Sequence, residues 1–410
     1  MNRFRGSIIT LVVGALAAVT LVTAPAGAAS KGASKAASGG TVKVGMIIPA
    51  TNSAGGLSLP QTKQTMVASV NAFNKRGGLD GKKIVLDLCD SKGDPNAESN
   101  CARQMVSDGV AATLDDFAVF NPSTTAQILG DAGIPRIGIN LLDISEFSSP
   151  VSFPLSSAPL GYFIAQEVGL IKAGHKKLAL VTVQTPSAGA VTGLIQPAAK
   201  GAGGEIVTTV LIPPGTTDYS QYVAAATKDG ADAIMLAVDY PDASQFMTAM
   251  QQLNSTTPLG ISASSFTLNN FKKFSTFTKT AVIADGSPNA TSNPKEFPFI
   301  TQYVKDMKAG GLAIADLKGQ SVSAWGSLLA FVTIMKGATT VDATSTLAAV
   351  KAATNVDMQG VIPPWTPGAP SESPIFKAVS NPNIYLQSFN GKTVKTNTPG
   401  IDVFAALNGK

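Results

Sequence analysis

The sequence predicts an α/β protein with two similar units, each a parallel β-sheet covered by helices. Short apolar runs rich in β-branched residues alternate with helical patterns from residue 41 onward, and the same alternation restarts near residue 160. The length of 410 residues allows two or three domain-sized units. Hydrophobic residues make up 44% of the chain and charged residues 14%. This composition is typical of folded chains with sizeable cores.

The first unit begins with an apolar strand at residues 42–48, which Pro49 ends, followed by a helix over Gln61–Lys75 with one apolar face. The elements predicted next are strand 83–88, a helix through 102–106, strand 110–114, helix 123–129 and strand 134–139. Because strands and helices alternate, we expect a parallel sheet with helices on both faces.

The second unit repeats this order and ends in a less regular tail. Its predicted elements are helix 161–172, strand 178–183, helix 192–199, strand 206–212, helix 222–227, strand 233–238, helix 243–253 and strand 259–262. The tail contains predicted helices at 321–336 and 343–352, a Pro-rich extended connection at 361–374, and a hairpin at 384–394 around Asn390-Gly391.

The first forty residues have the pattern of an export signal. Two arginines precede an apolar run at 8–22, and Ala26-Gly27-Ala28 provides small residues at the spacing of a signal-peptidase site. The run is shorter than the ~20 residues that span a bilayer. We therefore expect a signal peptide at 1–28, a flexible linker at 29–40, and an exported, periplasmic or cell-envelope protein. Because no Cys lies directly after the run, where a lipid would be attached, we expect no lipid anchor.

The net charge of +5 comes mainly from this leader. Four of the 31 Lys and Arg residues and none of the 26 Asp and Glu residues lie in the first forty positions, so the remainder has a net charge of +1. The basic composition is therefore no argument for binding nucleic acid or anionic membranes. The two cysteines, Cys89 and Cys101, flank a polar loop. In an exported protein we expect them to form a disulfide rather than two buried thiols.

Residue patterns typical of catalysis are missing. The single histidine, His175, lies among lysines before a strand, which favours a surface role, and one histidine cannot provide a multi-His metal site. No Gly-x-Ser-x-Gly occurs, and no Gly-x-Gly-x-x-Gly follows the first strand. Asp115-Asp116 could serve in acid–base chemistry, but a polar strand exit is the simpler interpretation. We expect no enzyme activity, no cofactor and no metal.

At this point the first hundred residues resemble a known family. The strand Thr41–Pro49, the following helix, Gly77-Gly78-Leu79-Asp80-Gly81 and the segment from Asp90 to Pro95 are similar, in order and spacing, to the start of type I periplasmic binding proteins. Gly133-Ile134-Pro135 fits the same pattern. The similar branch includes the leucine/isoleucine/valine-binding proteins of ABC transporters. The α/β alternation extends the resemblance over most of residues 41–410.

The resemblance implies two Rossmann-like lobes joined by a three-segment hinge, with the ligand in the cleft between them. Open α/β sheets in general bind ligands at the carboxyl ends of their strands. We predict lobe 1 at 41–155 plus 288–355 and lobe 2 at 156–287 plus 356–410. The expected partners are a small-molecule ligand and an ABC permease, with no nucleic acid, and the protein is expected to be a monomer.

The predicted ligand-binding residues follow the strand ends. In lobe 1 they are Asn52, Leu57, Val119, Phe120, Asn121, Asn140, Leu141 and Leu142, and in lobe 2 they are Gln184, Thr185, Asp239, Tyr240, Ser265 and Phe266. The aromatic residues at strand ends are the sharper predictions, because they provide large contact areas for a ligand.

The chain departs from the amino-acid-binding pattern of these relatives, which hold the ligand carboxylate with a small hydroxyl residue and backbone amides and the ammonium with an acid. The region 117–121 has no hydroxyl residue, and 262–270 has no acid, so Asp239 is the nearest replacement. We therefore expect weak or no binding of leucine, isoleucine and valine, and tighter binding of a more apolar or neutral solute. A ligand-sensing module that acts through a partner, or an enzyme on the same scaffold, are the alternatives to a transport receptor.

Overall fold

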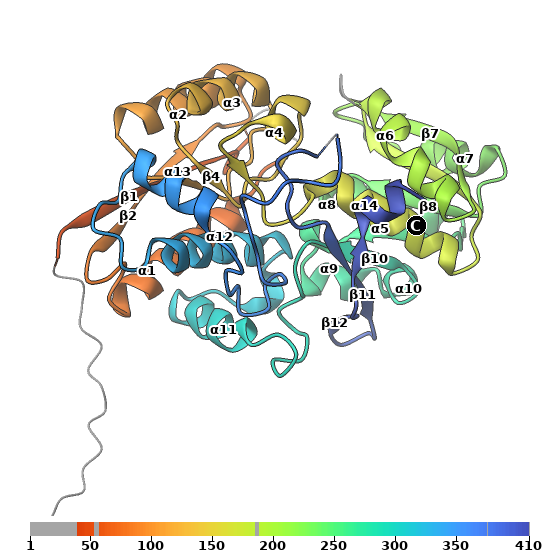
Figure 1. Cartoon of the computed structure of the whole chain (residues 1–410). Helices are drawn as coiled ribbons and strands as arrows, with labels where there is room; N and C mark the ends of the chain where they lie inside the picture. Colours follow the sequence, from red (N-terminus) through yellow and green to blue (C-terminus); the bar gives the residue numbers. More distant parts are fainter. Residues whose placement is uncertain (1–38, 53–56, 185–187, 375, 410) are drawn as a thin grey trace, which may run out of the picture. The chain divides into compact units, whose positions relative to one another are not determined.

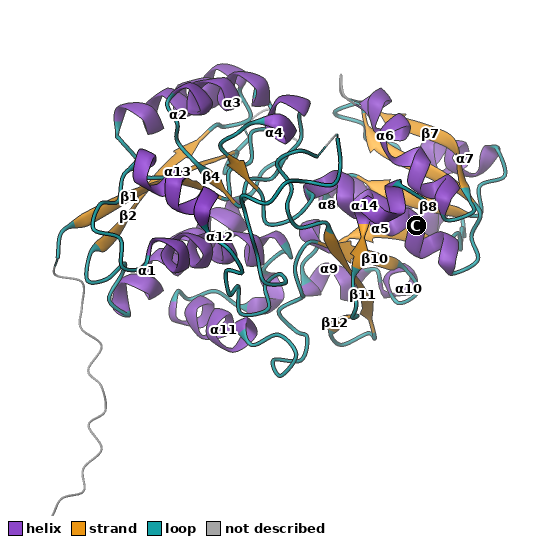
Figure 2. Ribbon diagram, in the orientation of Figure 1, coloured by secondary structure: helices purple, strands orange, loops and turns teal. Residues whose placement is uncertain are grey.

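The computed structural model describes residues 39–52, 57–184, 188–374 and 376–409. The predicted signal peptide and all but the last two residues of the predicted linker lie outside these residues. From residue 41 onward strands and helices alternate along the chain, as Figures 1 and 2 show.

The first sheet is parallel throughout. Its strands are β1 (Thr41–Ile48), β2 (Lys83–Asp90), β3 (Thr113–Leu114), β4 (Arg136–Ile137) and β5 (Ser152–Phe153), in the order β2-β1-β3-β4-β5. β1 is the longest inner strand, and its Val44, Met46, Ile47 and Ile48 are fully buried. Burial on both faces is what a β-branched, apolar strand of a parallel sheet requires.

Helices cover both faces of this sheet (Figure 1). One layer contains α1 (Pro60–Lys75), α11 (Phe299–Ala309) and α12 (Gln320–Met335), and α13 (Ala343–Ala352) packs against α12. The other layer contains α2 (Pro95–Ser107), α3 (Pro122–Asp131) and α4 (Ile144–Ser148). Trp325 of α12 packs against Phe73, Phe299 and Tyr303 in the first of these layers. Residues from 297–365 therefore complete the core that begins at residue 42.

The second sheet has a parallel body and an antiparallel edge. Its strands are β6 (Lys177–Val183), β7 (Glu205–Ile212), β8 (Ala233–Ala237), β9 (Leu259–Ser262), β10 (Val282–Asp285), β11 (Asn383–Phe389) and β12 (Val394–Thr396), in the order β12-β11-β10-β9-β8-β6-β7, with β13 (Ile401–Asp402) paired to β11. β11 runs antiparallel to β10, β12 and β13.

Two separate apolar cores lie on the two faces of the second sheet. One includes residues of α5 (Ala158–Lys172), α6 (Ala188–Gly201) and α14 (Val403–Leu407). The other includes residues of α7 (Ser220–Lys228), α8 (Tyr240–Gln252), α9 (Leu268–Lys273) and α10 (Ser275–Thr278). Helices therefore cover both faces, as the alternation of elements predicts.

The chain passes three times between the two sheets. It leaves the first sheet after β5, leaves the second after β10, and returns to the second before β11. The short 3-10 turns η1 (Ala263–Ser265) and η2 (Ile314–Asp316) lie after β9 and before α12. The predicted fold class, two lobes with parallel sheets, is confirmed.

Several elements differ from the sequence-based prediction. β3 and β4 contain only two residues each, shorter than predicted, and β5, α4, β10 and α11 were not predicted. β5 lies between Pro150 and Pro154, and a two-residue strand shows no periodicity that a sequence pattern could reveal. The hairpin at Asn390-Gly391 is present as β11 and β12.

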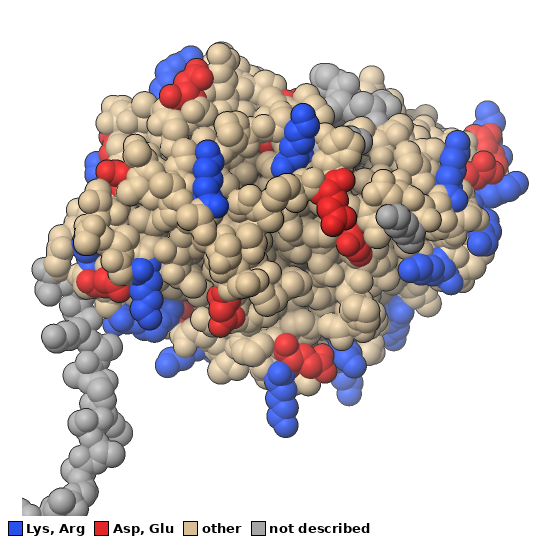
Figure 3. Space-filling view, viewed as in Figure 1, with Lys and Arg blue, Asp and Glu red and all other residues tan. Residues whose placement is uncertain are grey.

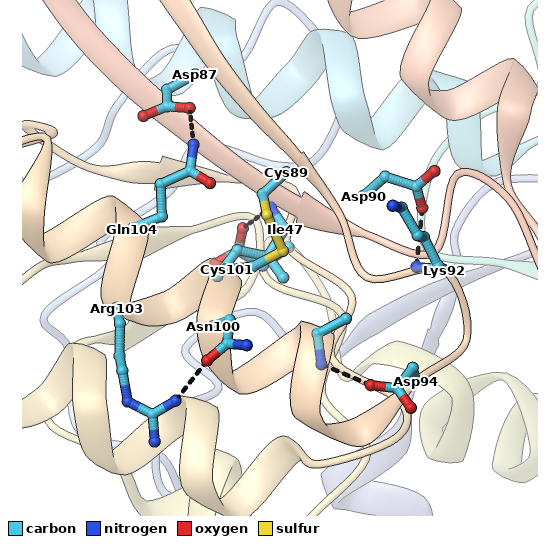
Figure 4. Close-up of a disulfide and its surroundings, with 12 residues drawn as sticks. Ile47, Asp87, Cys89, Asp90, Lys92, Asp94, Asn100, Cys101, Arg103 and Gln104 are labelled. Carbon is cyan, nitrogen blue, oxygen red and sulfur yellow. Dashed lines mark hydrogen bonds between the residues drawn. A yellow bond between two sulfur atoms is a disulfide. The ribbon is translucent and has the colours of Figure 1, made fainter.

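The predicted disulfide between Cys89 and Cys101 is confirmed (Figure 4). The two Cα atoms lie 5.5 Å apart, joining the end of β2 to the middle of α2. Between them, Asp94 begins α2 by accepting a hydrogen bond from the Ala97 N–H at 2.7 Å, with Pro95 in the first turn. The disulfide and this cap together position α2 against the first sheet.

Candidate functional site

Asp316 to Gly319, before α12, contacts loops at the carboxyl ends of the second sheet. Asn269 Nδ2 donates a hydrogen bond to Asp316 Oδ1 at 2.7 Å. Lys318 Nζ lies 3.4 Å from Asp239 Oδ1, directly after β8. The Gly319 N–H donates to the Ala263 carbonyl at 3.1 Å. A segment that packs with the first core therefore lies where open α/β sheets bind ligands.

A small cavity lies beside these contacts. Its volume is about 20 Å³, and residues from both regions line it: Phe266, Leu268, Asn289, Ala290, Thr291, Tyr303, Ile314, Leu317, Lys318, Gly319 and Val322. The Tyr240 ring packs edge-on against Phe266, with ring centroids 5.2 Å apart. Such a volume accommodates about one water molecule. A solute of several carbon atoms therefore requires the walls to separate.

Of the residues predicted in the second lobe, Phe266 lines this cavity, Tyr240 packs against Phe266, and Asp239 lies beside the lining residue Lys318. Ser265 is half-buried in η1, immediately before Phe266. Gln184 is exposed, and its N–H donates to the Ile212 carbonyl at 2.8 Å. Thr185 lies outside the described residues. Phe266 is thus the predicted aromatic residue that lines the cavity, whereas Gln184 has no described contact with it.

The loop after β3 surrounds a carboxylate that belongs to the chain itself. Glu98 of α2 is buried and accepts hydrogen bonds from the backbone N–H groups of Val119 (2.9 Å), Phe120 (3.2 Å) and Asn121 (2.6 Å). Burial raises the pKa of Glu98, and these three donors oppose that rise. The Asn121 side chain donates to Ser99 Oγ at 2.9 Å. These predicted site residues therefore bind Glu98 in this structure.

A second buried glutamate fills the loop after β4. The Leu142 N–H donates to Glu146 Oε2 at 2.9 Å, and Glu146 Oε1 lies 3.1 Å from Arg136. Arg136 also lies 3.3 Å from Asp116 Oδ2. Burial raises the pKa of Glu146 and of Asp116, and the Arg136 guanidinium opposes both rises. The network therefore joins Arg136 of β4 to Asp116, after β3, and to Glu146 of α4.

Asn140 and Leu141 are also engaged inside the protein. Asn140 Nδ2 donates to Asp115 Oδ1 at 3.3 Å, and Ser323 Oγ donates to the same oxygen at 2.7 Å. Burial raises the pKa of Asp115 well above its ordinary value, although both donors oppose the rise. Leu141 is fully buried in a core with residues of α5. Asp115 and Asp116 thus directly follow β3, at the predicted polar strand exit, and both are buried.

Asn52 and Leu57 lie after β1. Asn52 Nδ2 donates to the Leu57 carbonyl at 3.3 Å, and the Leu57 side chain packs against the first core. Gly93 has a positive φ of +74°, and a Cβ there would collide with the Asn52 amide. The structure therefore packs Asn52 closely against the loop after β2.

Asp285 lies at the end of β10, next to the same segment. Its side chain is buried, and burial raises its pKa to about 7, although the N–H groups of Ser287 and Gly286 oppose the rise. A Cβ at Gly319 would collide with Asp285 Oδ2 and with the Ala263 carbonyl. Glycine at 319 therefore permits the close approach of α12 to β9 and β10.

Sequence reasoning did not identify Lys318, Glu98, Arg136 or Glu146 as important. Lys318 precedes α12 in a segment without strand periodicity, and the glutamates lie on helices that look amphipathic and ordinary. An acidic residue among apolar or small residues on one helix face could have indicated the buried glutamates. A buried carboxylate requires a hydrogen-bond or charge partner, so such a residue predicts a polar contact inside the protein.

A larger hollow lies elsewhere in the described residues. It measures about 490 Å³ and lies between α1 and α11, lined by residues that include Asn71, Lys75, Lys83 and Asp306. Lys83 begins β2, so this hollow is at the amino end of the first sheet, and its described lining includes no residue of the second sheet. It is therefore not a cleft between strand ends.

The described residues contain no group of three or more His, Cys, Asp or Glu side chains placed to bind a metal ion. Within the same residues, no helix is long and apolar enough to cross a membrane. On the face shown in Figure 3, charged side chains of both signs are spread over the surface with wide uncharged areas between them.

The comparisons with known proteins agree with this architecture. A model of the periplasmic binding protein family matches residues 41–374. The Leu/Ile/Val-binding protein BraC3 of Rhizobium johnstonii is 27% identical over 93 residues, which cover 23% of this chain and 25% of that protein. The chain thus matches a quarter of the length of the curated relatives it resembles.

Solved structures show the same fold at low identity. A fatty acid ABC transporter substrate-binding protein from Thermomonospora curvata has a TM-score of 0.74 and 17% identity, covering 91% of this chain and 95% of that chain. A solute-binding protein of an ABC transporter from R. palustris, in complex with 4-hydroxybenzoate, has a TM-score of 0.71 and 16% identity, covering 88% and 98%. With the family model spanning most of the sequence, this chain belongs to the periplasmic binding protein family, whose members bind solutes without converting them.

Proposed function

We propose that this protein is an extracytoplasmic solute-binding protein of an ABC-type importer, which binds one small molecule between its two lobes by hinge closure. The observation that carries this proposal is the cavity at the strand ends, which residues from both regions line. A ligand that contacts both walls favours the closed arrangement, because only differential contacts shift such an equilibrium. We place the lobes at 41–155 plus 288–355 and 156–287 plus 356–410.

We further propose that the protein is exported, acts as a monomer and delivers its ligand to a membrane permease. The family and the leader pattern support export. Asp239, Tyr240 and Phe266 are the predicted residues that we place next to the ligand, together with Lys318. The other predicted strand-end residues remain predictions, since this structure engages most of them with the chain itself.

The ligand in this proposal is less charged or more apolar than a branched-chain amino acid. Asp239, the acid nearest the missing ammonium site, already lies beside Lys318. One structural neighbour is a fatty acid ABC transporter substrate-binding protein, a second is in complex with 4-hydroxybenzoate, and a third is in complex with isoleucine. A solute without an ammonium group is therefore within the range that this fold binds.

Two measurements test the proposed function. Mass spectrometry of protein exported by its native host should find one co-purifying small molecule per chain. Spin labels can be attached to cysteines that replace the exposed Lys63 of α1 and Lys228 of α7. After removal of the bound molecule, the distance between the two labels should shorten when the molecule is added back. A control pair within one region, at Lys63 and Arg103, should not move. An unchanged distance between Lys63 and Lys228 would contradict hinge closure.

A further inference from the structure

The backbone amides at the strand ends of the first sheet are already occupied by anions. Glu98 accepts hydrogen bonds from three consecutive N–H groups after β3, and Glu146 accepts one from Leu142 after β4. Both carboxylates are buried and belong to helices of the same lobe. A ligand carboxylate therefore needs a different partner in this chain.

Lys318 has the properties of such a partner. Its side chain is 9% exposed, and among the described residues its ammonium has one carboxylate within 4 Å, at 3.4 Å. An ammonium group carries three donors, and Asp239 Oδ1 is the only acceptor that the described residues offer it. A buried ammonium that gains an anion with closer hydrogen bonds is stabilised, because burial has removed its water.

The cavity beside Lys318 is otherwise apolar or neutral. Phe266, Tyr303, Ile314, Leu317 and Val322 provide aromatic and aliphatic walls, and Asn289 and Thr291 are its neutral polar residues. No acid is among the lining residues that the structure describes. A solute in this cavity therefore meets one positive charge and no negative charge.

Asp239 is poorly placed to bind an ammonium group of the same solute. It does not line the cavity, and its side chain is 18% exposed, twice the exposure of Lys318. When a ligand carboxylate takes its place at Lys318, Asp239 can keep part of its hydration. Asp285 Oδ2 lies against Gly319, a residue of the cavity wall, but Asp285 is not among the lining residues that the structure describes.

We propose that Lys318 binds a carboxylate of the ligand, and that the ligand is a monocarboxylic acid with an apolar body and no ammonium group. This inference rests on the proposed function, since it assigns a ligand class to the same cavity. The ligand carboxylate replaces Asp239 as the counter-ion of Lys318, and the apolar body lies against Phe266 and the walls from α11 and α12. No covalent step is involved.

Calorimetry with matched ligands tests the ligand class. One series is 4-methylpentanoate, 4-methylpentanamide and leucine, which share a branched body and differ in charge, and a second is benzoate and benzamide. In at least one series the acid should bind at least tenfold more tightly than its amide, and 4-methylpentanoate more tightly than leucine. Tighter binding of leucine or of an amide, or no binding of either acid by folded protein, would overturn the inference.

Variants test the role of Lys318 separately. Lys318→Met should weaken binding of the acid at least tenfold, Lys318→Arg should retain it, and Asp239→Asn should strengthen it by removing the competing carboxylate. Lys336→Met, at the exposed end of α12, is the matched control and should bind like the parent protein. Loss of binding in Asp239→Asn would point to a ligand ammonium and overturn the inference. A co-purified amide or amino acid would do the same while leaving the proposed function intact.

Discussion

Two buried cations of this protein have different surroundings. Arg136 lies within the first sheet, and its side chain and the carboxylates of Asp116 and Glu146 beside it are at most 1% exposed. Among the residues that the structure describes, Lys318 faces a single carboxylate, that of Asp239, which is 18% exposed and follows a strand of the other sheet. Arg136 therefore has two buried partners within its own lobe, whereas Lys318 has one partner across the strand ends.

The difference separates a structural charge from a binding charge. Asp116 also accepts hydrogen bonds from the Ile47 N–H at 2.9 Å and from Thr113, so that its network connects β1, β3 and β4. The side chains of this network are buried inside one lobe. The Lys318 pair, by contrast, adjoins a cavity, through which an incoming ligand can reach the ammonium donors that Asp239 leaves unused.

The largest expected effect comes from removing Arg136. Arg136→Met leaves two buried carboxylates without their cation, and we expect the free energy of unfolding to fall by about 3–5 kcal/mol. Urea unfolding measures the loss, with Arg103→Met, an exposed arginine on α2, as the control. A loss below about 1 kcal/mol would remove the distinction between the two cations.

The pH dependence of stability should show what it costs to ionise Asp285, at the end of β10 in the second sheet. Its pKa is about 7 in the folded protein and near 3.8 when unfolded, so the folded state retains a proton that the unfolded state releases. Stability should therefore fall as pH rises from about 4 to 7, by up to about 4 kcal/mol at about 1.4 kcal/mol per pKa unit.

The variant Asp285→Asn isolates this contribution. The difference in unfolding free energy between variant and parent should rise with pH between about 4 and 7 and stay constant above that range. Unfolding curves at a series of pH values measure it. A difference independent of pH would mean that the pKa of Asp285 is the same in the folded and unfolded protein.

The disulfide should have a slightly smaller effect, confined to the first region. It joins β2 to α2, which carries Glu98, across 12 positions of sequence. Replacing both cysteines with Ser should lower the free energy of unfolding by about 3 kcal/mol in the chain-entropy model. Urea unfolding of the double variant checks this value, and equal stability of the oxidised and double-variant proteins would refute it.

The smallest stability effect is expected at the strand ends. Lys318→Met and Asp239→Asn should each change the free energy of unfolding by no more than about 1 kcal/mol, because this pair is long and partly hydrated. The same urea experiment decides the matter. A loss of 3 kcal/mol or more for Lys318→Met would make Lys318 a structural cation like Arg136.

Most of the fold could be predicted from the sequence, because long strands and helices have clear periodicity. β1, β6 and β7 are long apolar strands, and the predicted α13 range agrees with the structure residue for residue. The strand-end aromatics Tyr240 and Phe266 were predicted from their positions after strands, and Phe266 is buried at the cavity while their role in binding stays a prediction. β3 to β5 are too short to show a period.

The pairing of charges at the site could not be predicted in this way. Lys318 and Asp239 are 79 residues apart, and no local pattern reports that they meet. Glu98 lies 21 to 23 residues from the amides that it contacts. Such contacts depend on how sheets and helices pack together, which is a property of the tertiary structure and not of any single segment.

Native mass spectrometry of the protein exported by its native host tests the central claim most directly. Parent protein and Lys336→Met should each contain one small molecule per chain, and Lys318→Met should contain none while remaining folded. Parent protein without any bound molecule, or full retention of the molecule in Lys318→Met, would contradict the assignment of this cleft as the binding site.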